Sequence, residues 1–294
     1  MNEHLGFIGT GNLGGAMVSG LLKAGFAVTI YDTDPDVLGR LRAEGAQIAA
    51  SARGVGDAAS IVFACLPSVE ISQQVALAPD GVAGGAAVEI YVEVSTLGID
   101  AIAAIAAGMA QRGIAVLDMP AVGGGGGSGV AEGKMSMISA GPRAAFDRVA
   151  PILGALTRNL FYVGEKHGLA QVCKMVNAAM AITGLTIACE AMVMGVKAGL
   201  DPQLLLDVVN AGSGRNVTTE ERFARTILAR KFGGSNQLRI ALKDMQLYAE
   251  TAHALKVPAF VGANIAEIWQ AANSRGGEHL IQFFESFADI EVKR

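Results

Sequence analysis

The sequence contains few of the residues from which metal centres and disulfide frameworks are built. Its 294 residues include 3 cysteines and 4 histidines. Cys65, Cys173 and Cys189 stand far apart in apolar surroundings, without the spacing of metal ligands. The first residues, MNEHLGFIG, lack the basic and apolar regions of a signal peptide. We therefore expect reduced thiols, no metal site and a cytoplasmic protein.

Charge and long apolar runs are also scarce. Charged residues make up 17% of the chain, the formal net charge is −4, and no basic block is present. This argues against nucleic acid and anionic membranes as partners. Residues 175–189 carry no charge, but such a stretch is shorter than the roughly 20 residues that cross a bilayer. Hydrophobic residues (51%) and 38 glycines instead predict a large core with many tight turns.

The first 160 residues alternate short apolar runs with segments of helical periodicity. The runs typical of strands are 5–8, 27–31, 60–65, 88–94, 114–117, 135–139 and 160–163. The helical patterns between the early runs are 13–23, 35–43, 69–76 and 99–112. Strand and helix alternation of this kind predicts a parallel sheet with helices on both faces.

After residue 163 the strand pattern stops and helical periodicity continues to the end of the chain. We predict an α/β domain over residues 1–163 and an all-α domain over residues 164–294. One long interdomain helix over 164–198 should join them. Because residues 175–189 are uncharged, most of the circumference of this helix is expected to be buried.

A glycine fingerprint follows the first expected strand and opens the first expected helix. Its residues are Gly9, Thr10, Gly11, Asn12, Leu13 and Gly14. In a Rossmann-type dinucleotide-binding domain, such glycines allow a tight turn, close approach of a pyrophosphate and close packing of helix on strand. The helix N-terminus supplies N–H groups and positive potential for the phosphates. The other interpretation is a glycine turn in an unrelated α/β protein.

Asp32 follows the second expected strand, about 20 residues after the fingerprint. A carboxylate at this place accepts hydrogen bonds from a ribose diol and repels a 2′-phosphate. The residue after it is Thr33 rather than an arginine. The sequence therefore favours NAD over NADP.

Two further features indicate a substrate site. Glycines 123–127 read either as a flexible linker or as an anion-binding concavity. Their position between two strands of one domain favours a site for a carboxylate or phosphate. Lys174 and Asn177 lie three residues apart on one face of the long helix. An ammonium beside an apolar helix is costly unless it is paired or functional, although a lone lysine there can also extend into solvent.

Four segments in order, 6–25, 118–133, 164–177 and 242–250, resemble the β-hydroxyacid dehydrogenases. The resemblance implies a Rossmann-type domain, a helical domain and an NAD(P)-dependent dehydrogenase or reductase. Hydride transfer would run between nicotinamide and a 3-hydroxy acid, similar to 3-hydroxyisobutyrate, or its semialdehyde. The resemblance also implies a homodimer or homotetramer that acts on a small molecule.

The same resemblance assigns roles to residues. Lys174 would be the catalytic acid/base, and Asn177 would orient the substrate beside it. Leu66 and Pro67 would border the nicotinamide ribose, and Ser95 and Thr96 would lie near the nicotinamide. Lys243 would touch cofactor or substrate. The substrate-binding positions would be Val122, Gly123, Gly124, Lys174, Asn177 and Lys243.

Three positions depart from the family pattern: Ala170 replaces a common glycine, and two positions lack a polar side chain. Val122 stands where the family usually has a serine, and Ala178 stands where a second amide often follows Asn177. Both changes predict a less polar pocket. They leave open an imine or keto reductase with an apolar pocket. A non-catalytic dinucleotide-binding protein is the remaining alternative, which Lys174 and Lys243 argue against.

Overall fold

The computed structural model describes residues 3–123, 127–232 and 236–293. The chain divides into two compact units, Met1–Lys174 and Met175–Arg294. The division falls inside helix α8 (Leu169–Lys197), so one continuous helix belongs to both units.

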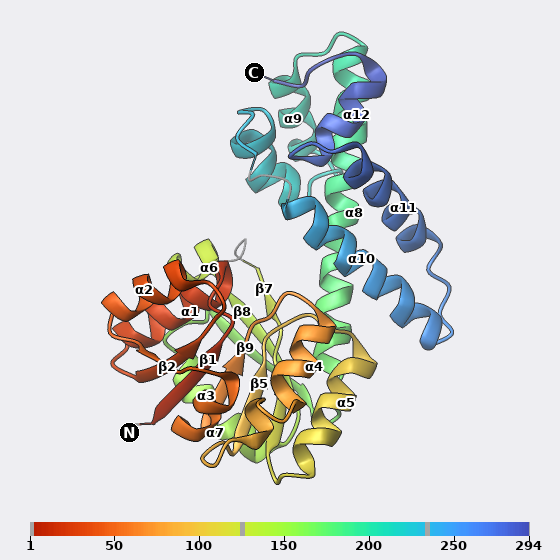
Figure 1. Cartoon of the computed structure of the whole chain (residues 1–294). Coiled ribbons are helices and arrows are strands. Elements are labelled where there is room, and N and C mark those ends of the chain that lie inside the picture. Colours follow the sequence, from red (N-terminus) through yellow and green to blue (C-terminus); the bar gives the residue numbers. More distant parts are fainter. Residues whose placement is uncertain (1–2, 124–126, 233–235, 294) are drawn as a thin grey trace. The chain divides into compact units, whose positions relative to one another are not determined.

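The described residues of the first unit form a nine-stranded sheet in the order β3-β2-β1-β4-β5-β6-β8-β7, with β9 paired to β8 (Figure 1). The strands are β1 (His4–Ile8), β2 (Ala27–Tyr31), β3 (Gln47–Ile48), β4 (Ile61–Ala64), β5 (Ile90–Glu93), β6 (Ala115–Asp118), β7 (Ala121–Val122), β8 (Ser136–Ala140) and β9 (Asn159–Gly164). Strands β1 to β6 are parallel, and β1 lies between β2 and β4. The strand order therefore reverses beside β1, which is where open α/β sheets bind ligands.

Helices cover both faces of this sheet. They are α1 (Asn12–Lys23), α2 (Pro35–Ala43), α3 (Ala52–Ala58), α4 (Val69–Leu77), α5 (Ile99–Ala110), α6 (Gly127–Ala131) and α7 (Arg143–Leu153), with a short 3₁₀ turn at Val82–Gly84. Neighbouring strand residues enter different apolar clusters: Phe7 and Val92 pack in one, Ile8 and Tyr91 in the other. This alternation is the period-2 geometry of a strand buried on both sides. The predicted fold class is thereby confirmed.

The sheet departs from the parallel arrangement at one edge. Strand β8 runs antiparallel to β6 and β7, while β9 is parallel to β8. A parallel connection needs a crossover of a dozen or more residues, which usually contains a full helix. Among the described residues between β7 and β8, the only helix is the five-residue α6, and the chain returns antiparallel. The link from β8 to β9 contains α7 and makes the parallel crossover.

Helix α8 begins at Leu169 rather than at residue 164. Gly164 still ends β9, and both Gly164 (φ +132°) and Gly168 (φ +94°) have positive φ, which an α-helix does not contain. The expectation that most of its circumference is buried is also wrong for the chain as described. Val176, Met180, Ile187 and Met194 form an exposed apolar row along the helix.

Length and composition alone would allow α8 to cross a membrane. Its most apolar 18-residue window has a mean hydropathy of 1.7, and 39% of that window is buried inside the described structure. The core helix of a soluble protein meets the same criterion.

The elements described in the second unit are all helical. After α8 come α9 (Pro202–Ala211), a π-helical segment (Thr218–Ile227), α10 (Asn236–Ala254), α11 (Phe260–Arg275) and α12 (Leu280–Ala288). Helices α10 and α11 pack side by side (Figure 1). Their core includes Met245 and Trp269, and the Trp269 indole N–H donates to the Thr186 hydroxyl at 2.8 Å. An all-α second part agrees with the sequence pattern.

Candidate active site

The glycine turn after β1 has the geometry that its sequence predicts. Gly9 has φ +81°, and a Cβ there would stand 2.2 Å from the carbonyl oxygen of Cys65. A Cβ on Gly14 would stand 2.0 Å from the carbonyl oxygen of Gly9, so both positions require glycine. A Cβ on Gly11 would meet nothing within 4 Å. The backbone is therefore open at Gly11, where the fingerprint expects the pyrophosphate.

The N-terminus of α1 is suited to an anion. Gly11 caps the helix without a side-chain hydrogen bond, and no acidic residue lies in the first turn. Gly11 and Asn12 are exposed, Leu13 is half-buried and Gly14 is buried. The first N–H groups thus keep their positive potential for a phosphate. These residues fit a dinucleotide.

Asp32 follows β2, and Thr10 of the glycine turn binds it. The Thr10 N–H and hydroxyl donate to Oδ2 of Asp32 at 2.5 and 3.0 Å, and the Asp34 N–H donates to Oδ1 at 3.0 Å. Burial raises the pKa of Asp32, but the hydrogen bonds from Thr10, Asp34 and Thr33 outweigh it, so the net pKa is lowered. The carboxylate is therefore ionised beside the turn, as a ribose acceptor must be.

One hydrogen bond joins the segments that follow β4 and β5, and a second holds Ser95 to the end of β5. The Leu66 N–H donates to the Ser95 hydroxyl oxygen at 2.7 Å, and the Ser95 N–H donates to Glu93 at 3.0 Å. Of the other residues expected near the nicotinamide, Thr96 is half-buried and Pro67 is exposed. Because β1, β4 and β5 are parallel and adjacent, these residues share the sheet edge that carries the glycine turn.

The start of α8 is attached to the same edge by Asp118, the last residue of β6. Its Oδ2 accepts the N–H groups of Gly168 at 3.0 Å and Gln171 at 3.3 Å. Burial raises the pKa of Asp118, and the bonds from Gln171 and Gly168 reduce the shift without reversing it. Lys174, one turn after Gln171, is half-buried.

Comparisons with known proteins agree with this geometry. Residues 4–164 match the model of the NAD-binding domain of 6-phosphogluconate dehydrogenase. Residues 168–281 match the model described as NAD-binding of NADP-dependent 3-hydroxyisobutyrate dehydrogenase. A 3-hydroxyisobutyrate dehydrogenase of Pseudomonas aeruginosa is 31% identical over 282 residues, which cover 94% of this chain and 94% of the relative. The chain belongs to the β-hydroxyacid dehydrogenase family.

Two further similarities extend over nearly the whole chain. An L-threonate dehydrogenase of Cupriavidus necator is 27% identical over 295 residues, covering 99% of this chain and 98% of the relative. The crystal structure of a 3-hydroxyisobutyrate dehydrogenase from Salmonella typhimurium superposes with a TM-score of 0.81 at 27% identity, covering 96% and 100%. This β-hydroxyacid dehydrogenase is thus an oxidoreductase that uses a nicotinamide dinucleotide.

The remaining predicted residues of the dehydrogenase lie in or after β7, where Val122 packs against the apolar cluster that contains Ala170 of α8, or in the second unit. Val122 is half-buried in β7, and Gly123 is exposed with φ +76°. Gly124 lies outside the described residues. Asn177 is exposed on α8 and Lys243 is half-buried on α10, both in the second unit. The roles of these five residues stay predictions.

Sequence reasoning missed the carboxylate of Glu93. This residue ends β5, is fully buried and accepts a hydrogen bond from the Tyr91 hydroxyl at 3.0 Å. Burial raises the pKa of Glu93 to about 7, against the lowering effect of its bonds with Ser95 and Tyr91. The available signal was an acidic residue at the end of an apolar strand, directly before Ser95.

The raised pKa of Glu93 makes the stability of this dehydrogenase pH-dependent. The neutral acid fits the core, so its contribution is complete below pH 4.5 and is lost as the pH rises through about 7. Glu93→Gln should therefore reduce the loss of unfolding free energy between pH 5 and pH 8 by at most about 3 kcal/mol. Urea unfolding at both pH values measures this. Glu267→Gln, at an exposed carboxylate on α11, is the control, and equal pH dependence in Glu93→Gln and the native chain would contradict the assignment.

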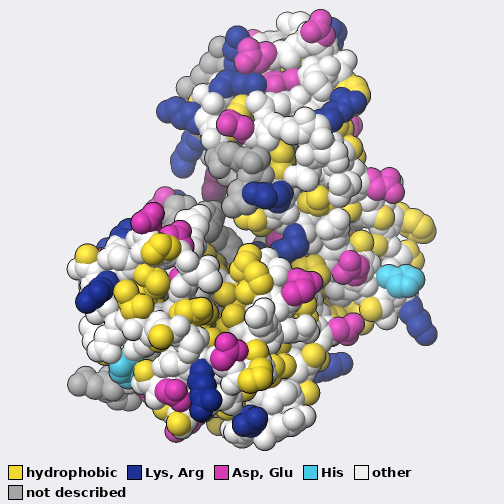
Figure 2. Space-filling view, viewed as in Figure 1, with side chains coloured by type: hydrophobic (Ala, Val, Ile, Leu, Met, Phe, Trp, Pro, Cys, Tyr) yellow, Lys and Arg dark blue, Asp and Glu magenta, His cyan; other side chains and the backbone are white. Residues whose placement is uncertain are grey.

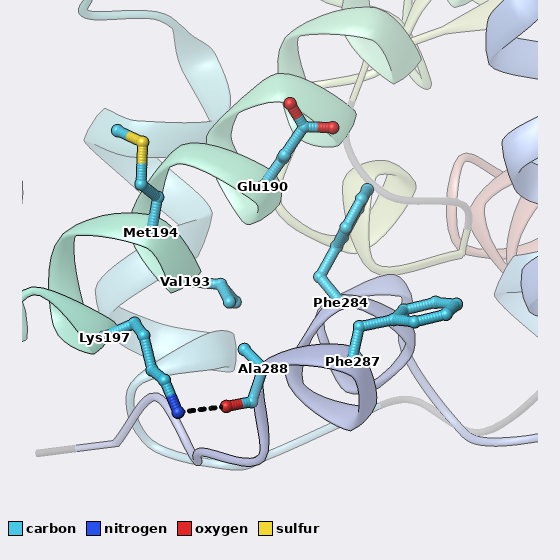
Figure 3. A pocket seen from close by; sticks show the side chains of 7 residues that line it. All are labelled: Glu190, Val193, Met194, Lys197, Phe284, Phe287 and Ala288. Atoms are coloured by element: carbon cyan, nitrogen blue, oxygen red, sulfur yellow. Dashed lines mark hydrogen bonds between the residues drawn. The ribbon is translucent and has the colours of Figure 1, made fainter.

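A shallow hollow of about 310 Å³ lies between α8 and α12 in the second unit. Val193 and Met194 line one side, and Phe284 and Phe287 line the other (Figure 3). The Lys197 ammonium donates to the Ala288 carbonyl oxygen at 2.7 Å. The hollow is mostly apolar, which suits packing better than hydride chemistry.

On the face shown in Figure 2, basic and acidic side chains are interspersed without a block of one sign.

Proposed function

We propose that this dehydrogenase acts on a 3-hydroxy acid or its semialdehyde, prefers NAD, and uses Lys174 as general acid/base. One observation carries the proposal. Hydrogen bonds of Asp118 and Gln171 hold the start of α8, the helix that bears Lys174, at the ends of β5 and β6. That sheet edge also carries the glycine turn and Ser95. The names of the relatives from Pseudomonas aeruginosa and Cupriavidus necator support an acid as substrate.

A bound nicotinamide would supply or accept the hydride. The side chains of the protein transfer the proton. In oxidation, Nζ of Lys174 takes the proton of the substrate hydroxyl; in reduction, it returns a proton to the forming alkoxide. The Asn177 amide can donate and accept, which suits it to hold the substrate hydroxyl. Gly11 and the N-terminus of α1 hold the pyrophosphate, and Asp32 accepts from the ribose.

The proposed substrate pocket contains valine at position 122 and is therefore less polar than a pocket with serine at this position. Val122 provides no hydroxyl for a substrate carboxylate, so the Gly123 N–H is the proposed donor. The test is a panel of 3-hydroxyisobutyrate, L-serine, L-threonate and cyclic imines, each with both cofactors. Turnover of a 3-hydroxy acid supports the proposal. Turnover of imines alone would favour an imine reductase, and tight NADH binding without any turnover would favour a non-catalytic role.

The preference for NAD is tested at Asp32. Its ionised carboxylate repels a 2′-phosphate, so the native chain should show a higher kcat/KM with NAD than with NADP. Asp32→Asn should move this ratio toward NADP by about tenfold, since one charge repulsion near the surface amounts to about 1 kcal/mol or more. Asp34→Asn is the matched control, because asparagine still caps α2 there. A native preference for NADP would contradict the proposal.

We also propose a homodimer or homotetramer, supported by the exposed apolar row on α8. Large apolar patches on a soluble protein are usually interfaces. The double variant Met180→Glu, Met194→Glu should lower the mass measured by light scattering, since both side chains are more than 70% exposed in the single chain. Gln111→Glu, exposed in the first unit, should leave the mass unchanged. A monomeric native protein at micromolar concentration would refute the proposal.

A further inference from the structure

The side-chain amide of Gln171 is fully buried and makes four hydrogen bonds. Its oxygen accepts the N–H groups of Leu97 at 2.8 Å and Gly98 at 3.2 Å. Its nitrogen donates to the Ser95 carbonyl oxygen at 3.2 Å and to Oδ1 of Asp118 at 2.6 Å. The amide thus uses two donors and two acceptor lone pairs, which is its full capacity. Its orientation is fixed, because exchanging oxygen and nitrogen would oppose donor to donor and acceptor to acceptor.

Asp118 binds both this amide and the backbone at the start of α8. One of its oxygens accepts the backbone N–H groups of Gly168 and Gln171, and the other accepts the Gln171 side chain. The carboxylate therefore serves as a cap for α8 supplied by β6. A buried polar group that loses its partner costs free energy, so these contacts hold the first turn of α8 in one place.

The segment that Gln171 binds is the one expected to border the nicotinamide. The Ser95 hydroxyl oxygen accepts the Leu66 N–H, and the Ser95 N–H is bound by Glu93. Through Ser95, the ends of β4 and β5 are linked to the glutamine, and through Asp118 so is the end of β6. Residues distant in sequence thereby meet at one side chain.

Lys174 follows Gln171 by three residues on the same helix, a rise of about 4.5 Å and nearly one full turn. The two side chains therefore lie on similar faces of α8. A helix turn is stiff, so a shift or rotation at Gln171 is passed to Lys174 almost unchanged.

We propose that Gln171 is a positioning residue for hydride transfer, because it locks the Ser95–Gly98 segment to the turn of α8 that precedes Lys174. The proposal rests on the proposed role of Lys174 as acid/base. It concerns the distance between the proton-transferring amine and the strand ends that receive the nicotinamide. A loosened lock lowers the fraction of bound complexes that have reacting geometry, whereas the dinucleotide is still held by the glycine turn.

The test compares Gln171→Met, which keeps the length and removes all four hydrogen bonds, with the native chain. We expect kcat on the fastest 3-hydroxy acid of the panel to fall at least tenfold. The dissociation constant of NADH, measured by its fluorescence, should change less than threefold. The primary isotope effect with deuterated nicotinamide should increase, since the hydride step becomes rate-limiting. Gln270→Met, the same replacement at an exposed site on α11, should change none of these values.

A rescue experiment separates positioning from a general loss of folded protein. Gln171→Glu alone places a second carboxylate against Asp118 and should be inactive or unfolded. In the double variant Gln171→Glu, Asp118→Asn, the new amide can donate to the new carboxylate, and Leu97 and Gly98 keep their acceptor. The Ser95 carbonyl oxygen loses its donor, so the rescue is partial. We expect the double variant to fold and to have a kcat at least tenfold above that of Gln171→Glu. A double variant that folds no better and turns over no faster than Gln171→Glu would overturn the proposal.

The outcomes also distinguish this proposal from the proposed function. If Gln171→Met lowers kcat only in proportion to the number of NADH-binding sites titrated per chain, fewer active molecules explain the loss and the positioning role is wrong. If Gln171→Met has native kcat while Lys174→Ala is inactive, only the positioning role fails. If Lys174→Ala keeps native turnover, the proposed function fails first, and the positioning role fails with it.

Discussion

Lys174→Ala is expected to lower kcat at least 10²-fold, while the dissociation constant of NADH changes less than about threefold. A positioned general acid/base contributes about 10² to 10⁴ to the rate, and the variant loses this contribution with the amine. The side chain lies on α8, apart in sequence from the glycine turn that is expected to bind the pyrophosphate. The change is measured by following the absorbance of reduced nicotinamide and, separately, its fluorescence on binding.

Lys166→Ala is the matched control for this prediction. Lys166 is exposed just before α8, so its replacement removes the same charge from the same end of the helix. We expect native kcat in this variant. Turnover near the native value in folded Lys174→Ala would show that another group transfers the proton.

Gly11→Ala is expected to weaken dinucleotide binding on the order of 10²-fold, with a loss of stability of at most about 1 kcal/mol because alanine is a poorer N-cap than glycine. A Cβ at position 11 meets nothing within 4 Å, so the protein itself accommodates alanine. The same methyl group stands where the pyrophosphate approaches the backbone, and hydrogen bonds to a charged group contribute about 1.5–3 kcal/mol each. Titration with NADH and urea unfolding measure the two effects separately.

Two other glycines provide the comparison. Gly39→Ala, inside α2 with open space around it, should leave binding unchanged and raise stability by about 0.5–1 kcal/mol. Gly14→Ala should prevent correct folding of the turn, because its Cβ would stand 2.0 Å from a carbonyl oxygen. Unchanged NADH affinity in folded Gly11→Ala would place the pyrophosphate elsewhere.

The features that could be predicted from sequence are local ones. The turn from Gly9 to Gly14 is a single loop, and its steric requirements select glycines at positions close together in the sequence. The alternation of strands and helices can likewise be recognised in short stretches of sequence. Asp32 was found because its spacing from the turn is set by one helix and one strand. The hydrogen bonds between Asp32 and Thr10 could not be predicted, because they depend on the pairing of β1 with β2.

The features that were missed depend on tertiary contacts or on very short elements. Glu93, Asp118 and Gln171 converge only because β5, β6 and the start of α8 meet. Strand β3 has two residues and α6 has five, too few for periodicity to be detected. Helix α8 was predicted to start at residue 164, but the positive φ of Gly164 and Gly168 excludes both residues from it.

The sequence contains a single tryptophan, and its burial beside Thr186 makes it a spectroscopic marker of the second unit alone. Indole emission therefore follows denaturation of the helices, while the emission of bound NADH follows the nucleotide-binding unit. Superimposable curves from the two fluorophores would mean that both units melt as one cooperative body. Separate curves would reveal which of them melts first, with no label attached to the protein.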